Sequence, residues 1–373
     1  MPLISFSDDR YDSDNFLPLG ICPGPSQPKD LDSFLGPFLE ELKLLEDGVP
    51  AYDAYTESEF LLKAHLVLVT GDTTGISKLL HLSGHVAKHP CRACTSAGTP
   101  YKIPFKDKNG RQGEKTQYYY PLQPFMDSTN GSRSPRRTAS SWQFDIRNLP
   151  RRTEAQYLAD GQASLDNPKC AVDSGVKGKS PLVDLPTFSF PESAPFDSMH
   201  LVFLNFVRHL CALVSGKYFK DAILNNHSGR MTEKDWVKLG IDMSNIEAPV
   251  SWGRYPRNIE KYIKGFKAEE LSNFLIHYLL PLSFNRVSRS TFRAFQRLVF
   301  AISMAISYEI NMEEIDEVET HLILFIKWFY DTFYQGKYER LPACKYTIHA
   351  MVHIFQDIRN WGPVCYYWQF PEV

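Results

Sequence analysis

Long apolar runs are missing from this sequence. No stretch reaches the 18 or more apolar residues that a transmembrane helix needs, and the most apolar segment, from Leu298 to Ile310, is interrupted by Glu309. A secretory signal peptide is missing too, because the first residues lead directly into an acidic stretch at residues 8–12. We therefore expect a soluble protein with no membrane partner.

The sequence also lacks an excess of charge of either sign. Lys and Arg number 41 and Asp and Glu number 43, so the formal net charge is -2. This balance gives no general attraction to nucleic acid, and any DNA contact must come from local basic patches. The 7 cysteines form an odd set with no signal peptide before them, which favours a reducing compartment.

The composition does supply a hydrophobic core. Hydrophobic residues make up 43% of the chain and aromatic residues 13%, which over 373 residues is enough for one large domain or two ordinary ones. Residues 1–16 are polar, acidic and without periodicity, and we predict a disordered leader there. No internal repeat is visible.

Residues 17–90 show alternating strand and helix signals. A short apolar run at residues 17–22 ends in a turn and predicts a strand. Apolar residues then recur every three or four positions over residues 30–45, which predicts an amphipathic helix that Asp30 or Asp32 can cap. The nearly continuous apolar run at residues 61–69 predicts a buried strand that ends close to Asp72.

Residues 91–195 lose regular periodicity beyond residue 101 and accumulate Gly, Ser, Pro and basic residues. We predict a loop-rich insertion with a basic face, for which an ordinary solvated loop is the alternative. Its candidate DNA-binding side chains are Arg133, Arg136, Arg137, Arg151 and Arg152.

Helical spacing dominates from residue 196 onward. It covers residues 198–214, 269–280, 290–310, 314–333 and 346–358, and predicts a helical insertion domain at residues 196–353. Asp197 is the natural N-cap of the first helix and His200 lies in its first turn. A catalytic or DNA-contacting role of this pair is the alternative.

Two short motifs carry metal-ligating side chains, Cys91-Arg92-Ala93-Cys94 and the pair His349 and His353. A C-x-x-C turn can direct two thiolates to one ion, and two histidines four residues apart share one face of a helix. Alone, each pair could be buried thiols in a loop or an ordinary helix surface. Together they predict a structural, tetrahedral zinc site.

Two acidic residues flank these motifs. Asp72 lies nineteen residues before Cys91, and Glu372 lies nineteen residues after His353, in the segment 354–373 that returns to the core. A zinc ion bound by both motifs would bring these flanks together. Neighbouring carboxylates are tolerated when divalent cations neutralise them, so we predict Mg2+ or Mn2+ at Asp72 and Glu372. A helix N-cap and a solvated terminal acid are the alternatives.

Further short phrases are distributed along the chain: Pro23-Gly24-Pro25, Asp32-Ser33-Phe34-Leu35, Gly71-Asp72-Thr73-Thr74, Leu82-Ser83-Gly84-His85, Tyr119-Tyr120-Pro121-Leu122, Leu149-Pro150-Arg151-Arg152-Thr153, Gly178-Lys179-Ser180-Pro181-Leu182, Asp197-Ser198-Met199-His200, Trp361-Gly362-Pro363 and Trp368-Gln369-Phe370. Together with the C-x-x-C motif, their order and number resemble the CACTA (En/Spm) family of DNA transposases of fungi and plants.

The resemblance implies an RNase H-like core in which two aspartates and one glutamate hold two metal ions for DNA cleavage and strand transfer. Asp72 falls on the second aspartate of the family and Glu372 on its glutamate. The cysteine and histidine pairs resemble the zinc layout of the related recombination-activating recombinase. The implied partners are transposon-end DNA and a second copy of the chain, and the implied location is the nucleus.

One departure from the family pattern is important. The chain starts too late to contain the first catalytic aspartate and stops one residue after Glu372. We therefore expect an inactive or incomplete transposase, with a domesticated DNA- or protein-binding module or a decayed fragment as alternatives. The predicted fold is an α/β, partial RNase H-like core with a large, mainly α-helical insertion tied by zinc.

Overall fold

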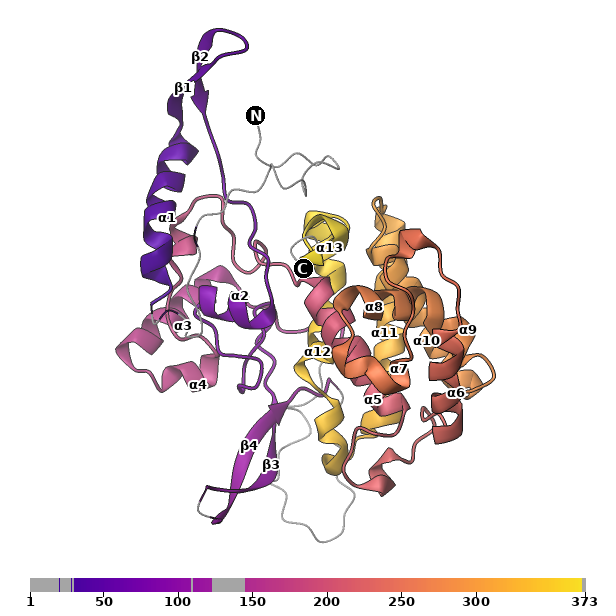
Figure 1. The fold of residues 1–373 in the computed structure, drawn as a ribbon. Helices are drawn as coiled ribbons and strands as arrows, with labels where there is room; N and C mark the ends of the chain where they lie inside the picture. Colours follow the sequence, from indigo (N-terminus) through magenta and orange to yellow (C-terminus); the bar gives the residue numbers. More distant parts are fainter. Residues whose placement is uncertain (1–19, 21–27, 29, 109, 123–144, 371–373) are drawn as a thin grey trace. The chain divides into compact units, whose positions relative to one another are not determined.

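The computed structural model describes residues 20, 28, 30–108, 110–122 and 145–370, which form two compact units (Figure 1). Unit 1 comprises residues up to Gly84 together with 152–195, and unit 2 comprises 85–151 together with residues from Phe196 onward. The predicted leader and nearly all of the predicted strand at 17–22 lie outside the described residues. Each unit is therefore assembled from two separate parts of the chain.

Unit 1 begins with helix α1, Asp32–Asp47, which confirms the helix predicted for residues 30–45. The Asp30 carboxylate accepts hydrogen bonds from the N–H groups of Asp32 and Ser33 at 3.1 and 3.3 Å, so it caps the helix as predicted. After Gly48, the antiparallel hairpin of β1 (Val49–Asp53) and β2 (Ser58–Leu62) follows.

The prediction of a buried strand at residues 61–69 is wrong. Only its first two residues belong to β2, and residues 63–72 form no strand. This segment is held instead by isolated bonds: Val69 N–H donates to the Ser193 carbonyl at 2.8 Å, and the Thr187 hydroxyl donates to the Leu66 carbonyl at 3.1 Å. Its apolar side chains pack on the core of unit 1, which explains their hydrophobicity without a sheet.

The rest of unit 1 is helical. It contains α2 (Thr73–Leu79), α3 (Glu154–Asp166), α4 (Cys170–Ser174) and a 3-10 turn at Pro181–Asp184. The buried Tyr157 hydroxyl joins two of these parts, because it donates to the Leu80 carbonyl and accepts from Ser180 N–H, both at 2.9 Å. Gly161 of α3 lies so close to Gly178 that an added Cβ would be 2.8 Å from the Gly178 carbonyl oxygen.

Unit 2 opens with a second antiparallel hairpin, β3 (Thr99–Lys106) and β4 (Gln112–Tyr119). This hairpin and the helices α3 and α4 all lie in the range predicted to be loop-rich, so that prediction missed a hairpin and two helices. Both sheets formed by the described residues are two-stranded hairpins. The RNase H-like core stays a prediction.

All five helical segments predicted for the second half of the chain are confirmed. The main helices are α5 (Arg208–Val214) after a π-helical turn (Met199–Val207), α6 (Glu233–Ser244), α7 (Ile259–Tyr262), α8 (Ala268–Asn273), α9 (Leu279–Ser283), α10 (Arg289–Ala305), α11 (Met312–Phe329), α12 (Tyr346–Ala350) and α13 (Ile354–Trp361). Shorter π or 3-10 turns cover Ala222–Asn225, Val250–Trp252, Ile263–Gly265, Phe274–Tyr278, Tyr330–Tyr334, Tyr338–Ala343, Met351–His353 and Val364–Tyr366.

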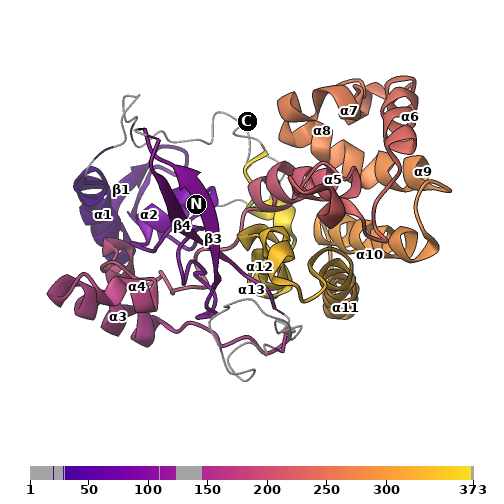
Figure 2. The ribbon, with the colours of Figure 1, turned by 90° about the horizontal axis from the view of Figure 1, so that it is seen from below.

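The core of unit 2 is built on the pair α10 and α11, which lie side by side in both views (Figure 1, Figure 2). Large aromatic side chains fill the space around α11, where Phe206, Phe325 and Phe329 are fully buried and in mutual contact. Within the described ranges, no helix is both long and apolar enough to cross a membrane.

Candidate metal centre

The four predicted zinc ligands lie together in unit 2. Cys91 and Cys94 belong to the loop that precedes β3, His349 lies on α12, and His353 ends the short turn between α12 and α13. The loop is held by two backbone hydrogen bonds: Thr95 N–H donates to the Pro150 carbonyl at 2.9 Å, and Gly98 N–H donates to the Lys88 carbonyl at 2.7 Å.

The distances fit one tetrahedral ion. The Cys91 sulfur lies 3.4 Å from His353 Nε2, the Cys94 sulfur lies 3.3 Å from His349 Nε2, and all four ligand atoms lie within 4.8 Å of one another. With Zn–S and Zn–N bonds of about 2.3 and 2.0 Å, the sulfur-to-nitrogen edge of a zinc tetrahedron is about 3.5 Å. Three of the ligands are buried and His353 is half-buried, as in a closed structural site.

The electrostatics of the two thiols also favour a cation. Burial acts to raise the pKa of Cys91, but the neighbouring Cys94 and the two histidines outweigh it and hold that pKa well below its usual range. Burial and the adjacent Cys91 raise the pKa of Cys94 well above its usual value. One thiol of the pair is thus the more readily ionised, and a bound divalent cation would favour the thiolate form of both.

Aromatic side chains orient the two imidazole rings. The Tyr346 ring stacks on His349 with centroids 6.0 Å apart, and the Phe196 ring stacks on His353 at 5.7 Å. The hydroxyl oxygen of Ser96 lies 3.3 Å from the Cys94 sulfur. Sequence reasoning missed this outer shell, although Ser96 and Tyr346 lie only two and three residues from a ligand and could have been sought by that spacing.

The structure confirms the capping role predicted for Asp197. Its buried carboxylate accepts hydrogen bonds from the N–H groups of Met199 and His200, both at 3.1 Å, and lies 2.5 Å from His200 Nδ1. The N–H of Gln369 also donates to it at 3.1 Å. The carboxylate thus ties the start of a helix to the segment after α13.

The two predicted catalytic acids are not brought together among the described residues. Asp72 is exposed in unit 1 and is the N-cap of α2, where its Oδ1 accepts a hydrogen bond from Gly75 N–H at 2.5 Å. Glu372 lies outside the described residues. The N-cap alternative for Asp72 is therefore confirmed, and the divalent-cation site stays a prediction.

The arginines predicted to bind DNA lie in different surroundings. Arg133, Arg136 and Arg137 lie outside the described residues, whereas Arg151 is exposed and donates a hydrogen bond to Gln356 at 2.5 Å. Arg152 is buried in unit 1.

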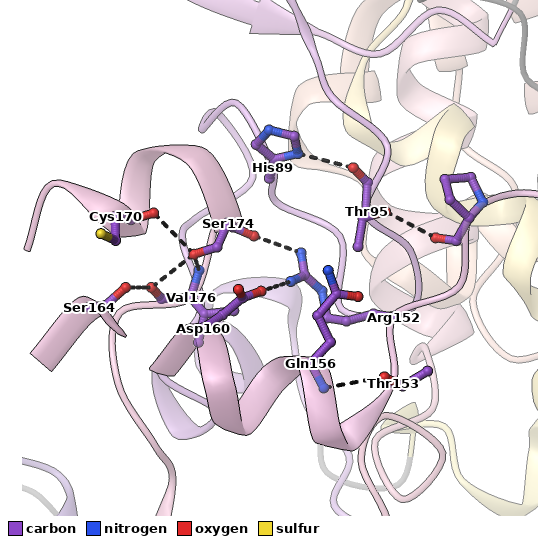
Figure 3. A network of polar contacts seen from close by, with 11 residues as sticks. His89, Thr95, Arg152, Thr153, Gln156, Asp160, Ser164, Cys170, Ser174 and Val176 are labelled. Atoms are coloured by element: carbon purple, nitrogen blue, oxygen red, sulfur yellow. Dashed lines mark hydrogen bonds and ion pairs between the residues drawn. The ribbon is translucent and has the colours of Figure 1, made fainter. Parts of the chain in front are cut away.

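The Arg152 guanidinium donates to the Ser174 carbonyl at 3.0 Å and lies 3.8 Å from an Asp160 carboxylate oxygen (Figure 3). With a side-chain exposure of 0%, it cannot reach a DNA phosphate, and the prediction that it binds DNA is corrected.

Comparison with known proteins relates part of this chain to a transposase family. Residues 10–135, which are 126 of the 373, match the family model described as transposase family tnp2. The matched range contains Asp72, the candidate metal ligands Cys91 and Cys94, and the β3–β4 hairpin. Neither the curated proteins nor the solved structures contain a significant match to this chain. The match supports a transposase-related function.

Proposed function

We propose that this chain is a transposase-related protein that acts on DNA and whose helical unit is held together by a structural zinc ion. The observation that carries the proposal is the convergence of Cys94 and His349, which are 255 positions apart, into one buried two-cysteine, two-histidine set. Such a set leaves no open coordination position, which is typical of structural zinc.

Metal analysis of the purified chain tests the zinc site. We expect about one zinc ion per chain, lost in the double variant Cys91→Ser, Cys94→Ser, because serine replaces both thiolate ligands. Cys170→Ser is the matched control, since Cys170 lies on α4 in unit 1 and outside the ligand set. Equal zinc contents in the double variant and the control would overturn the proposal.

For the chemistry, we assign to Asp72 and Glu372 the binding of Mg2+ or Mn2+ in the manner of a CACTA-type, DDE transposase. These ions supply the activation of water, and then of a DNA 3′-hydroxyl, for phosphodiester cleavage and strand transfer. The exposure of the Asp72 carboxylate supports this role, since only Oδ1 is engaged by the α2 cap. The proposed substrate is the DNA of transposon ends. We propose that a homo-oligomer of the chain binds it in the nucleus.

Two substitutions of Asp72 separate a catalytic role from a capping role. Asp72→Ala removes cap and carboxylate and should cost about 1 kcal/mol of unfolding free energy, whereas Asp72→Ser keeps a capping oxygen and should cost only a few tenths. If Asp72 binds a metal, both variants should bind Mn2+ more weakly than wild type in a calorimetric titration, a readout that does not require the chain to be an active nuclease. Wild-type Mn2+ affinity of Asp72→Ser would contradict the metal-binding assignment.

A second candidate function is a non-catalytic DNA- or protein-binding module with the same structural zinc. This function is favoured because the described residues provide a geometry for a structural metal ion but none for a catalytic one. Within the described part of the chain, the zinc set is the one group of three or more His, Cys, Asp or Glu side chains close enough to hold an ion. A wild-type chain that contains zinc and binds DNA, but does not nick it in magnesium or manganese, would favour this candidate.

A further inference from the structure

The β3–β4 hairpin differs in charge from the rest of the chain. Between Thr99 and Tyr119 it has five cations and two acids, a net charge of +3, whereas the whole chain has -2. The five cationic side chains are all exposed, and within the described ranges none of them forms an ion pair. They are Lys102, Lys106, Lys108, Arg111 and Lys115.

These cations are concentrated toward the free end of the hairpin. Lys106 is the last residue of β3 and pairs with Gln112, and the turn between them holds Lys108 and Arg111. The Asp107 carboxylate, one of the two acids, accepts a hydrogen bond from Arg111 N–H at 2.8 Å and so closes the turn. The turn therefore presents positive charge to solvent.

The other end of the hairpin is fixed to the helical part of unit 2. The Tyr101 ring lies 5.0 Å from the Tyr338 ring, and Lys102 N–H donates to the Tyr338 hydroxyl at 3.2 Å. Further out, the Phe105 ring covers Gly113, where an added Cβ would lie 3.0 Å from the ring. Figure 1 shows the ribbon extending away from the helices of its own unit. The charged turn is thus presented on a stiff arm.

The dimensions suit duplex DNA. Strands of 8 residues span about 25 Å at roughly 3.3 Å per residue, and the major groove of about 12 Å admits a two-stranded ribbon. The range that matches the transposase family model includes the whole hairpin. The β1–β2 hairpin of unit 1 has the opposite character, because residues 49–62 contain three acids and no cation.

We propose that the β3–β4 hairpin is a duplex-DNA-binding arm whose Lys106, Lys108 and Arg111 side chains contact backbone phosphates. The proposal rests on the proposed function, namely action on DNA, and names the surface that carries it. Neutralising phosphates releases counterions, so each such contact should appear in the salt dependence of binding.

The test compares two triple variants of the zinc-loaded, full chain by fluorescence anisotropy on a 30-base-pair duplex over a range of NaCl concentrations. The hairpin variant is Lys106→Gln, Lys108→Gln, Arg111→Gln. The control is Lys234→Gln, Lys238→Gln, Lys264→Gln, which removes the same charge from exposed positions elsewhere in unit 2. Circular dichroism and zinc content should be unchanged in both.

We expect the hairpin variant to bind at least tenfold more weakly than wild type at about 100 mM salt. The slope of log affinity against log salt should fall by about 0.9 for each lost contact, and the control should follow wild type. If the hairpin variant binds the duplex with the affinity of wild type, or if the control is weakened equally, the hairpin is not the DNA-binding arm. Either result leaves the proposed action on DNA intact. Equal competition by single-stranded RNA or polyglutamate overturns the duplex assignment. If wild type shows no salt-dependent DNA binding, the arm and the proposed function both fail.

Discussion

Arg151 and Arg152 are neighbours in sequence and have opposite surroundings. The first is exposed, and the second has 0% side-chain exposure with its guanidinium bonded to the Ser174 carbonyl. Both count equally as basic residues in a sequence, so charge pattern alone placed both on a DNA-binding face. The difference depends on Asp160 and Ser174, which the fold brings to Arg152 and which no local pattern in the sequence specifies.

His209 is the residue for which we expect the clearest pH effect. It is buried on α5, and its two ring nitrogens have no hydrogen-bond partner within the described residues. Burial, together with the nearby Lys345, holds its pKa well below the usual range. The folded chain therefore keeps this ring neutral, while the unfolded chain protonates it below a pH of about 6.5. Its contribution to stability is lost as pH falls.

His209→Phe should keep the ring contacts with Tyr218 and Phe329 and remove both unpaired nitrogens. We expect a gain of about 1–2 kcal/mol in unfolding free energy at pH 8, growing by up to about 1.4 kcal/mol for each pH unit below 6.5. Urea titrations at pH 8 and pH 5 measure this, with the exposed His85→Phe as control. An equal difference at both pH values would show that His209 does not titrate on unfolding.

Among the secondary-structure elements, the amphipathic helices were the predictable part of the fold. A spacing of three or four residues is a local property, and it identified α1, α10 and α11 within a few residues. The apolar run at residues 61–69 misled because hydrophobicity alone does not distinguish a strand in a sheet from an extended segment packed on a core. The β3–β4 hairpin was missed because Pro100, Pro104 and Gly113 break the strand pattern.

The contact between α3 and residue 178 gives a test of packing in unit 1. Gly161→Ala should cost about 1–3 kcal/mol of unfolding free energy, because the new methyl group would meet backbone atoms of Gly178, which cannot move cheaply. Gly84→Ala, in the same unit, would meet no atom within 4 Å and should be neutral or slightly stabilising. Denaturant unfolding of both variants measures the difference, and equal stabilities would contradict the close approach.

For the whole molecule, the set of Cys91, Cys94, His349 and His353 joins two distant parts of unit 2 and includes no residue of unit 1. Sequence chemistry was sufficient to pair the cysteines with the histidines, because four such ligands complete a tetrahedron. It could not supply the packing of Tyr346 and Phe196 around the imidazoles, since those contacts depend on how helices and loops meet in space.

If this set binds the proposed zinc ion, removal of the ion should act on one unit. After treatment with a chelator, we expect amide hydrogen exchange to rise at residues 85–98 and 346–361, while α1 and α3 of unit 1 keep their protection. Mass spectrometry of peptides from the full chain measures this, and the Cys91→Ser, Cys94→Ser variant should show the chelated pattern without chelator. A uniform rise over both units would contradict a local role for the ion.

The 255 positions between Cys94 and His349 also set an order of events on the ribosome. At about 5–20 residues per second, the two thiols emerge roughly 10–50 s before the imidazoles that complete their set. The first segment of unit 1 is made before that interval and the second, residues 152–195, during it, so unit 1 can fold before the imidazoles are made. A nascent chain interrupted before His349 has only the two thiols of the set, so the proposed zinc site can be completed only after His353 has been made.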